Sequence, residues 1–181
     1  MRPGESMIKF GVNDRPDVAS ILPEHGIKPE ADVVSFPSLR PHLRVQHTRW
    51  IEIPRIIDGE DGILSVAEGQ KNIPFNIKRV YYIYSLQYFQ HVQRGKHAHK
   101  TLEQVLFCIN GRCKVILNDG SETQEVILSR PHSGIYLGPR LWHVMHSFED
   151  NCILLVFASD FFNEEDYIRN FDDYLEYLRR P

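Results

Sequence analysis

The sequence predicts an all-β protein, an antiparallel β-barrel of the jelly-roll kind, with a C-terminal α-helix outside it and an irregular N-terminal arm. Three observations support this fold class. Between residues 49 and 158, short apolar runs of strand type alternate with turn signals, and no helical periodicity intervenes. Six of the eleven prolines precede residue 49. After residue 163, apolar residues recur at spacings of three and four.

The N-terminal arm is expected to span residues 1–48, and a single barrel domain to span residues 49–181. Proline fixes φ and removes a backbone donor, so its density in the arm disfavours a regular core element. The arm also lacks a cluster of acid–base residues. We therefore expect it to serve assembly rather than chemistry.

The first strands of the barrel are short and separated by turns. Residues 50–57 form the first, and Pro54 within them favours an edge strand or a bulge. Residues 58–62 are a turn, and residues 72–75 a loop. The other predicted strands of this half are residues 63–67, 78–84 and 94–100.

The second half continues the same pattern. Residues 103–109 and 112–117 are predicted to form a hairpin, because Asn110 and Gly111 between them are a strong tight-turn pair. Residues 118–120 turn the chain again. The remaining predicted strands are residues 125–128, 134–137, 142–148 and 152–158.

The C-terminal stretch is predicted to be an amphipathic helix packed on the outside of the barrel. Asn163 can cap its start, and the acidic residues 164–166 suit its positive end. Its apolar stripe runs from Tyr167 to Leu178, and Arg179 and Arg180 suit its C-terminal end.

Composition excludes several classes of protein. A formal net charge of -3 argues against a general nucleic-acid binder. No apolar run approaches the roughly 18 residues of a membrane span, and the N-terminus lacks the apolar core of a signal peptide. The three cysteines lie in apolar strand runs without metal-type spacing. We read them as reduced core residues of a cytoplasmic protein.

His97 and His99 are the centre of the predicted site. Residues i and i+2 of a strand point to the same face, so both imidazoles should project into one space while Ala98 faces away. Two polar rings inside a small barrel destabilise it unless they are hydrogen-bonded or functional. We therefore expect this pair to act in chemistry.

Two kinds of chemistry fit the pair. The first is a metal site, since cupin-type barrels commonly present His-x-His, a nearby carboxylate and a later histidine. Here that set is His97, His99, Glu103 and His143, which suits a divalent transition metal. Strand alternation would place Glu103 on the histidine face.

The second is metal-free acid–base chemistry. Imidazole has an ordinary pKa near neutrality, about 6.5, and two imidazoles on one face can exchange protons with a bound substrate. Arg79 and Arg94 are close in sequence and are predicted to hold a diphosphate, because guanidinium binds phosphate bidentately. With the tyrosines of residues 81–84, this mouth suits a phosphorylated or nucleotide-linked sugar.

Several segments together resemble the nucleotide-sugar 3,4-ketoisomerases, the WxcM-like cupin-fold enzymes of dTDP-deoxysugar pathways. The resemblance covers residues 50–178, in the same order and with similar spacing. The segments are residues 72–75, 78–83, 94–100, 104–106, 142–143, 158–160 and 166–169.

The resemblance implies a substrate, a dTDP-linked 4-keto-6-deoxy sugar, and its conversion to the 3-keto isomer through an enediol. It also implies a homodimer, no metal or redox cofactor, and a role in polysaccharide biosynthesis such as that of the O-antigen of lipopolysaccharide. The family's two histidines fall on His97 and His99, and its active-site tyrosine on Tyr82, with Tyr84 as the alternative. We expect His99 to be the base at C3 and His97 to shuttle the second proton.

Two alternatives on the same fold stay open beside the metal site. A sugar-nucleotide epimerase would use a similar histidine and tyrosine arrangement with different flanking motifs. A non-catalytic sugar-binding barrel would not need both imidazoles. The resemblance also leaves the galacto or gluco configuration at C4 undecided.

Overall fold

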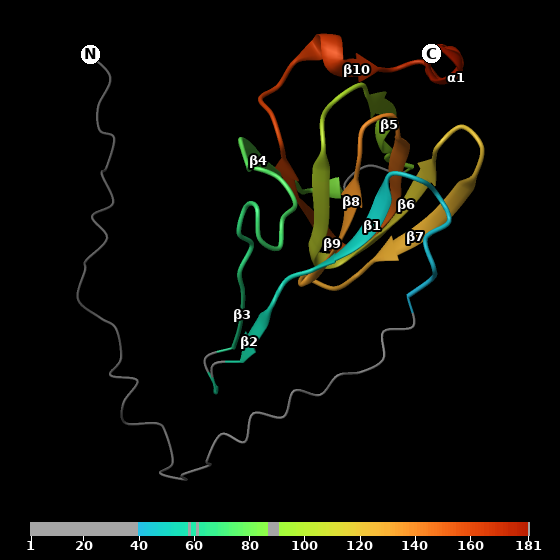
Figure 1. Cartoon of the computed structure of the whole chain (residues 1–181). Helices are drawn as coiled ribbons and strands as arrows, with labels where there is room; N and C mark the ends of the chain where they lie inside the picture. The colour runs from blue at the N-terminus through green and yellow to red at the C-terminus, as the bar shows by residue number, and fades with distance from the viewer. Residues whose placement is uncertain (1–39, 58, 61, 87–90, 181) are drawn as a thin grey trace, which may run out of the picture. The chain divides into compact units, whose positions relative to one another are not determined.

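The structure, a computed structural model, describes residues 40–57, 59–60, 62–86 and 91–180. It is mostly antiparallel sheet, with one short C-terminal α-helix, as the sequence predicted (Figure 1). Its strands are β1 (Thr48–Glu52), β2 (Arg55–Ile57), β3 (Ile63–Ser65), β4 (Arg79–Ile83), β5 (Arg94–His99), β6 (Gln104–Asn118), β7 (Thr123–Leu128), β8 (Ser133–Leu137), β9 (Trp142–Ala158) and β10 (Tyr167–Ile168). A 3₁₀ helix, η3 (Glu164–Asp166), and helix α1 (Phe171–Arg179) complete the described elements.

The main sheet is built around two long strands, β6 and β9. They pair with each other along their whole length, from Gln104 opposite Ala158 to Asn118 opposite Trp142. The order of neighbours is β1, β8, β6, β9, β5 and β10, while β4 joins β9 and β7 joins β6. Strands β2 and β3 form a separate hairpin, and the break between β1 and β2 falls at Pro54, as expected.

The hairpin predicted at Asn110 and Gly111 is wrong, because the chain continues through them as one strand. The Asn110 amide donates to the carbonyls of Asp150 and Asn151 on β9, at 3.0 and 2.9 Å. Gly111 has φ 67°, and the register of β6 against β9 shifts on both sides of it. The left-handed conformation that favours Asn-Gly in turns is therefore used here for a bulge. The predicted strands 142–148 and 152–158 likewise join as β9.

The main core lies on the inner side of this curled sheet. Leu106 on β6, Ile135 on β8 and Leu154 on β9 are essentially fully buried in it. Val45, within the stretch predicted as an arm, is buried in the same core. Residues 40–48 thus pack with the barrel, and the rest of the predicted arm lies outside the described residues.

The C-terminal helix is shorter than predicted and begins later. Asn163 caps η3 rather than α1, and the side chain of Asn170 caps α1 by accepting from the amides of Asp172 and Asp173. Between them, β10 pairs with β5 in place of a helical turn. The packing of α1 is as predicted: Tyr174 is fully buried beside Trp142. Among the described residues, no helix is long and apolar enough to cross a membrane.

Candidate active site

Three histidine rings from two neighbouring strands meet at one point of the sheet. His97 and His99 come from β5, and His143 comes from β9, where its backbone pairs with His97. The ring centroid of His97 lies 4.8 Å from that of His99 and 4.7 Å from that of His143. Ala98 packs elsewhere, in a cluster with Trp142. The shared face predicted for His97 and His99 is confirmed.

Hydrogen bonds at Nδ1 fix the tautomers of the two β5 histidines. The Nδ1 of His99 lies 3.0 Å from Oδ2 of Asp166, and the Nδ1 of His97 lies 2.9 Å from the carbonyl oxygen of Gly95. A carboxylate and a carbonyl can only accept, so both Nδ1 atoms donate when the rings are neutral. Each Nε2 therefore keeps its lone pair. The Nε2 of His99 is buried and has no hydrogen-bond partner among the described residues.

Asp166 is a site residue that the sequence analysis missed. Its carboxylate accepts from four donors: the His99 ring, the amide and hydroxyl of Thr101, and the amide of Leu102. These bonds join the end of η3 to the turn that follows β5. The acidic run of residues 164–166 was assigned to a helix N-terminus, and only the fold brings Asp166 to a histidine 67 positions away.

Burial keeps all three imidazoles neutral in the free protein. It lowers the pKa of His97 to about 4, helped by the nearby His99. It also lowers the pKa of His99 to about 4, although Asp166 acts in the opposite direction by favouring the imidazolium. Burial and the two neighbouring rings lower the pKa of His143 well below 6.5. The group can thus accept a proton rather than donate one at neutral pH.

A cavity of about 500 Å³ opens against this group. His97, His143 and Tyr167 form part of its wall, and the ring of His99 lies next to them, 4.8 Å from that of His97 and 4.3 Å from that of Tyr167. The cavity wall also carries the two arginines predicted to bind substrate, Arg79 and Arg94.

Arginines make part of the cavity wall cationic. The Nε of Arg79 is buried without a hydrogen-bond partner among the described residues. Arg169, which the sequence analysis did not select, also lines the cavity. Its guanidinium lies over the ring of Tyr167 at 4.3 Å and pairs with Glu164. The unpartnered Nε of Arg79 near neutral imidazole is an arrangement that suits an anionic ligand.

The tyrosine in the cavity is Tyr81, not the predicted Tyr82. Tyr82 is 64% exposed and lies against Tyr84 on the outer side of β4. Tyr81 lines the cavity, its hydroxyl accepts from the Gln104 side chain at 2.8 Å, and burial raises its pKa to about 12. The reason is the alternation of side chains along a strand. Arg79 and Tyr81 point inward, so Val80 and Tyr82 point outward.

Glu103 does not join the histidines, contrary to the predicted alternation. Strand β5 ends at His99, and the chain bends before β6 starts at Gln104, so Gln104 takes the inward position. Glu103 instead accepts a hydrogen bond of 2.6 Å from the hydroxyl of Tyr136. The four residues predicted as metal ligands are therefore not gathered. In the described part of the chain, only the three cysteines bring three such donors within 4.8 Å.

The sequence and the fold both match known proteins. Residues 46–179 match the FdtA family, described as WxcM-like, C-terminal. A TDP-4-oxo-6-deoxy-alpha-D-glucose-3,4-oxoisomerase of Aneurinibacillus thermoaerophilus is 48% identical over 130 residues, which cover 72% of this chain and 91% of the relative.

Two solved structures of 3,4-ketoisomerases are similar to this chain in both sequence and fold. A 3,4-ketoisomerase from Helicobacter canadensis superposes with a TM-score of 0.69 at 41% identity, covering 74% of this chain and 98% of that one. A variant of the 3,4-ketoisomerase QdtA from Thermoanaerobacterium thermosaccharolyticum, in complex with TDP-4-keto-6-deoxyglucose, gives a TM-score of 0.71 at 40% identity. It covers 75% of this chain and 96% of that one.

Proposed function

The chain belongs to the FdtA family and is a TDP-sugar 3,4-ketoisomerase, and we propose that the histidine group in its cavity moves the protons of the reaction. The substrate is a dTDP-4-keto-6-deoxyhexose. One observation supports the proton-transfer proposal most directly. His97, a neutral imidazole with an unprotonated Nε2, lines a cavity that also carries Arg79, and the unpartnered Nε2 of the neutral His99 lies next to it.

The isomerisation requires only proton transfers. A base removes the proton at C3, and the electron pair of that C–H bond forms the C3–C4 double bond of an enediol while the C4 oxygen takes a proton. The C3 hydroxyl then loses its proton, its oxygen becomes the new carbonyl, and C4 receives a proton. No net electrons enter or leave the sugar, so the chemistry calls for no redox cofactor.

We assign the C3 base to His99 and the oxygen-to-oxygen shuttle to His97. The Nε2 of His99 has a lone pair, and Asp166 on the opposite side of the ring stabilises the imidazolium that forms when this nitrogen takes the proton. His97 lies in the cavity wall beside it, where it can carry a proton between the two sugar oxygens. Tyr81, whose hydroxyl stays protonated, can donate a hydrogen bond to a substrate oxygen.

We assign binding of the diphosphate to the arginines of the cavity wall. Arg79 and Arg94, which the sequence predicts as diphosphate-binding residues, both line the cavity, and Arg169 adds a third guanidinium. Arg79 is the best placed of the three, because its buried Nε has no partner among the described residues.

The function is tested by mixing the purified protein with dTDP-4-keto-6-deoxyglucose and following the sugar by NMR. We expect the 4-keto signals to be replaced by those of a 3-keto isomer. The NMR spectrum also identifies the configuration at C4. A substrate that stays unchanged would refute the ketoisomerase, and inversion at C3 or C5 with the ketone still at C4 would indicate an epimerase.

We further propose that two copies of the chain form a homodimer through the β2–β3 hairpin. This hairpin is a sheet of its own, and an isolated two-stranded hairpin is only marginally stable in water. Its facing pairs Ile56 with Leu64 and Ile57 with Ile63 are all about half exposed or more. A covering surface would remove this apolar area from water, and a second copy supplies one.

The dimer is tested with a charge placed on the hairpin. Ile63, which is 57% exposed, is replaced by Lys, and Ile127 on β7, which is 56% exposed, is replaced by Lys as the matched control. We expect light scattering after size exclusion to report a dimer for the parent and the Ile127→Lys variant, and a monomer for Ile63→Lys. A dimer in all three would place the interface elsewhere.

The cellular setting is proposed on chemical grounds. The three cysteines are free thiols in the core, which favours the reducing cytoplasm. A 3-keto-6-deoxy sugar on a nucleotide suits later transamination and transfer into a polysaccharide such as the O-antigen of lipopolysaccharide.

A further inference from the structure

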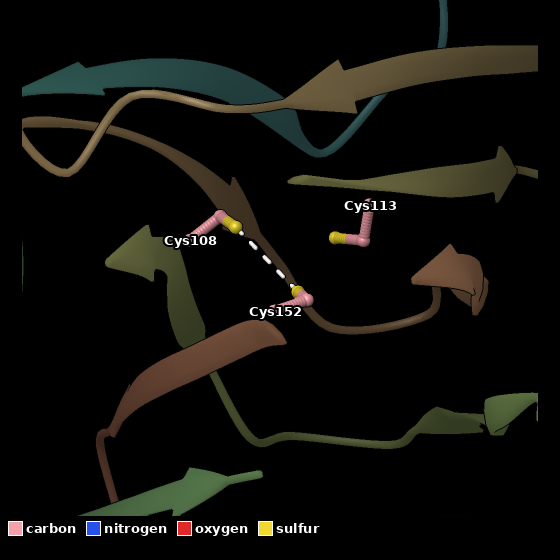
Figure 2. Close-up of side chains that lie close together, drawn as sticks. All are labelled: Cys108, Cys113 and Cys152. Carbon is pink, nitrogen blue, oxygen red and sulfur yellow. Dashed lines mark hydrogen bonds between the residues drawn. The ribbon is translucent and has the colours of Figure 1, made fainter. Parts of the chain in front are cut away.

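The three cysteines of the chain gather at one place in the core (Figure 2). Cys108 and Cys113 come from β6, and Cys152 comes from β9. Their sulfur atoms all lie within 4.8 Å of one another, and those of Cys108 and Cys152 are 3.6 Å apart. All three residues are 2% exposed or less.

The bulge in β6 creates this cluster. Residues five apart in a regular strand point to opposite faces, so Cys108 and Cys113 would not meet on an even strand. The left-handed conformation of Gly111 and the register shifts around it reverse the parity. As a result, the positions that face the main core change from even numbers before the bulge, Leu106 and Cys108, to odd numbers after it, Cys113 and Val115.

The three thiols also interact with one another. The Cys108 S–H can donate to the Asn110 carbonyl at 3.1 Å, and Cys108 and Cys152 can share a hydrogen bond. Hydrogen bonds with Cys113 and Cys152 lower the pKa of Cys108. Hydrogen bonds with Cys108 and Cys152, together with burial, raise the pKa of Cys113. The cluster is therefore a set of three soft donors in mutual contact rather than three isolated core side chains.

We propose that Cys108, Cys113 and Cys152 form a buried binding site for one thiophilic, three-coordinate ion, and that trivalent arsenic is the ion it fits best. A metal–sulfur bond of about 2.3 Å, as for zinc, places ligating sulfurs about 3.8–4.0 Å apart. The sulfurs already lie at 3.6 Å and within 4.8 Å, so side-chain adjustments of less than about 1 Å complete the site.

The charge of the complex decides between the candidate ions. Three thiolates leave a net charge of −2 on a monovalent ion, −1 on a divalent ion and zero on a trivalent one. The neighbours of the cluster are apolar, including Val115, Leu128 and Leu154, and an unpaired charge among them is strongly disfavoured. The neutral tris-thiolate of trivalent arsenic avoids that penalty. No fourth donor from His, Cys, Asp or Glu joins the group among the described residues.

The binding reaction is balanced without an oxidant. Arsenous acid, As(OH)₃, is neutral at pH 7. Its three As–O bonds break, three As–S bonds form, and each thiol proton leaves with a hydroxide as water. No electrons are transferred and no thiolate has to exist alone in the core. The ion would tie β6 to β9 at the bulge and stabilise the fold by mass action.

The test uses the full-length reduced protein, a phosphine reductant and sodium arsenite. Native mass spectrometry is expected to show a gain of one arsenic atom less three hydrogens per chain, and X-ray absorption to show three sulfur neighbours. The melting temperature should rise with arsenite concentration. Because the chain has three cysteines in all, no other thiol contributes to the signal.

Cys113→Ala is the comparison variant, since it leaves the close pair Cys108 and Cys152 in place. It should lose the three-sulfur species and the rise in melting temperature. Zinc and monovalent copper, tested alone, should bind more weakly, and zinc binding should release protons and weaken at lower pH. The proposal is overturned if the folded parent takes up no arsenic, or if its arsenic has two sulfur neighbours. These readouts do not depend on isomerase activity.

Discussion

Replacing Asp166 by Asn tests how the fold prepares His99 for proton transfer. The carboxylate accepts from four donors, and His99 donates to its Oδ2 at 3.0 Å. An Asn side chain has a single acceptor oxygen. It can accept either from Thr101, which bonds Oδ1 in the parent, or from His99 and Leu102, which bond Oδ2, and its NH₂ group faces the other set. The favourable response of His99 is to turn its Nδ1 into an acceptor, which puts the proton on Nε2. That tautomer cannot take a proton from C3.

The expected losses are different for rate and for stability. Loss of a correctly protonated general base lowers kcat by about 10²–10⁴, equivalent to about 2.7–5.4 kcal/mol of transition-state stabilisation. Loss of hydrogen bonds to a charged group lowers the free energy of unfolding by about 1.5–3 kcal/mol. The assays are NMR turnover of the 4-keto sugar, exchange of its C3 proton with deuterium, and urea unfolding.

Asp119→Asn is the matched control. Asp119 also accepts from four donors, the amides of Gln46, Ser121 and Glu122 and the Ser121 hydroxyl, but it holds no histidine. It should lose similar stability and keep kcat. If Asp166→Asn keeps kcat and C3 exchange while losing as much stability as Asp119→Asn, the reasoning is refuted, and Asp166 only supports the turn after β5.

Three further predictions follow from the same geometry. Arg79→Ala should raise KM with little change in kcat. The ratio of the variant's KM to the parent's KM should shrink as salt is added, because salt screens the attraction of Arg79 for the substrate in the parent. An unchanged KM would remove Arg79 from the substrate site. Because burial lowers the pKa of His97 and His99 to about 4, the unfolded chain binds more protons than the folded one below about pH 6.5. The free energy of unfolding should therefore fall as pH drops from about 6.5 to about 4. kcat/KM should stay high until the pH approaches the lower value. A kcat/KM profile that falls at the ordinary histidine pKa, about 6.5, would contradict a buried, neutral site. Gly111→Ala should lower the free energy of unfolding in urea by more than about 2 kcal/mol, since its φ is 67° and the new Cβ would clash with the carbonyl oxygen of Glu149. Gly59→Ala is the control, because Gly59 also has positive φ but has open space around it, and it should cost only about 1 kcal/mol. Equal costs would show that the bulge is not tightly packed.

Local patterns in the sequence were enough to predict the fold class and the histidine pair. Strand alternation is a property of two neighbouring peptide units, so it placed His97 and His99 on one face without knowledge of the rest of the fold. Pro54 marked a real break between β1 and β2 for the same local reason.

The errors arose where a distant partner decides the outcome. Asn110 and Gly111 favour a left-handed residue in either a turn or a bulge, and the carbonyls of β9, some 40 positions away, select the bulge. Tyr81 and Tyr82 lie on a strand with mixed residues on both faces, so the sequence does not reveal which tyrosine points inward.

Asp166 shows the same limitation for the site itself. Its neighbours in sequence favour a helix start, and its role depends on pairing between β10 and β5. One signal in the sequence could have selected it: Asp166 begins the segment 166–169, which resembles the family although it lies outside the predicted barrel strands. A carboxylate in such a stretch is a candidate partner for a catalytic histidine.

The central claim, proton transfer by the histidine group, is tested most directly by C3 exchange in deuterium oxide. The dTDP-4-keto-6-deoxy sugar is incubated with the parent, with His99→Asn and with His97→Asn, and NMR follows both deuterium at C3 and the 3-keto product. We predict that His99→Asn loses exchange and turnover together, because abstraction at C3 is the first step. His97→Asn should lose turnover by about 10²–10⁴ and keep detectable exchange. The reverse pattern would exchange the two roles, and normal turnover in both variants would contradict the claim.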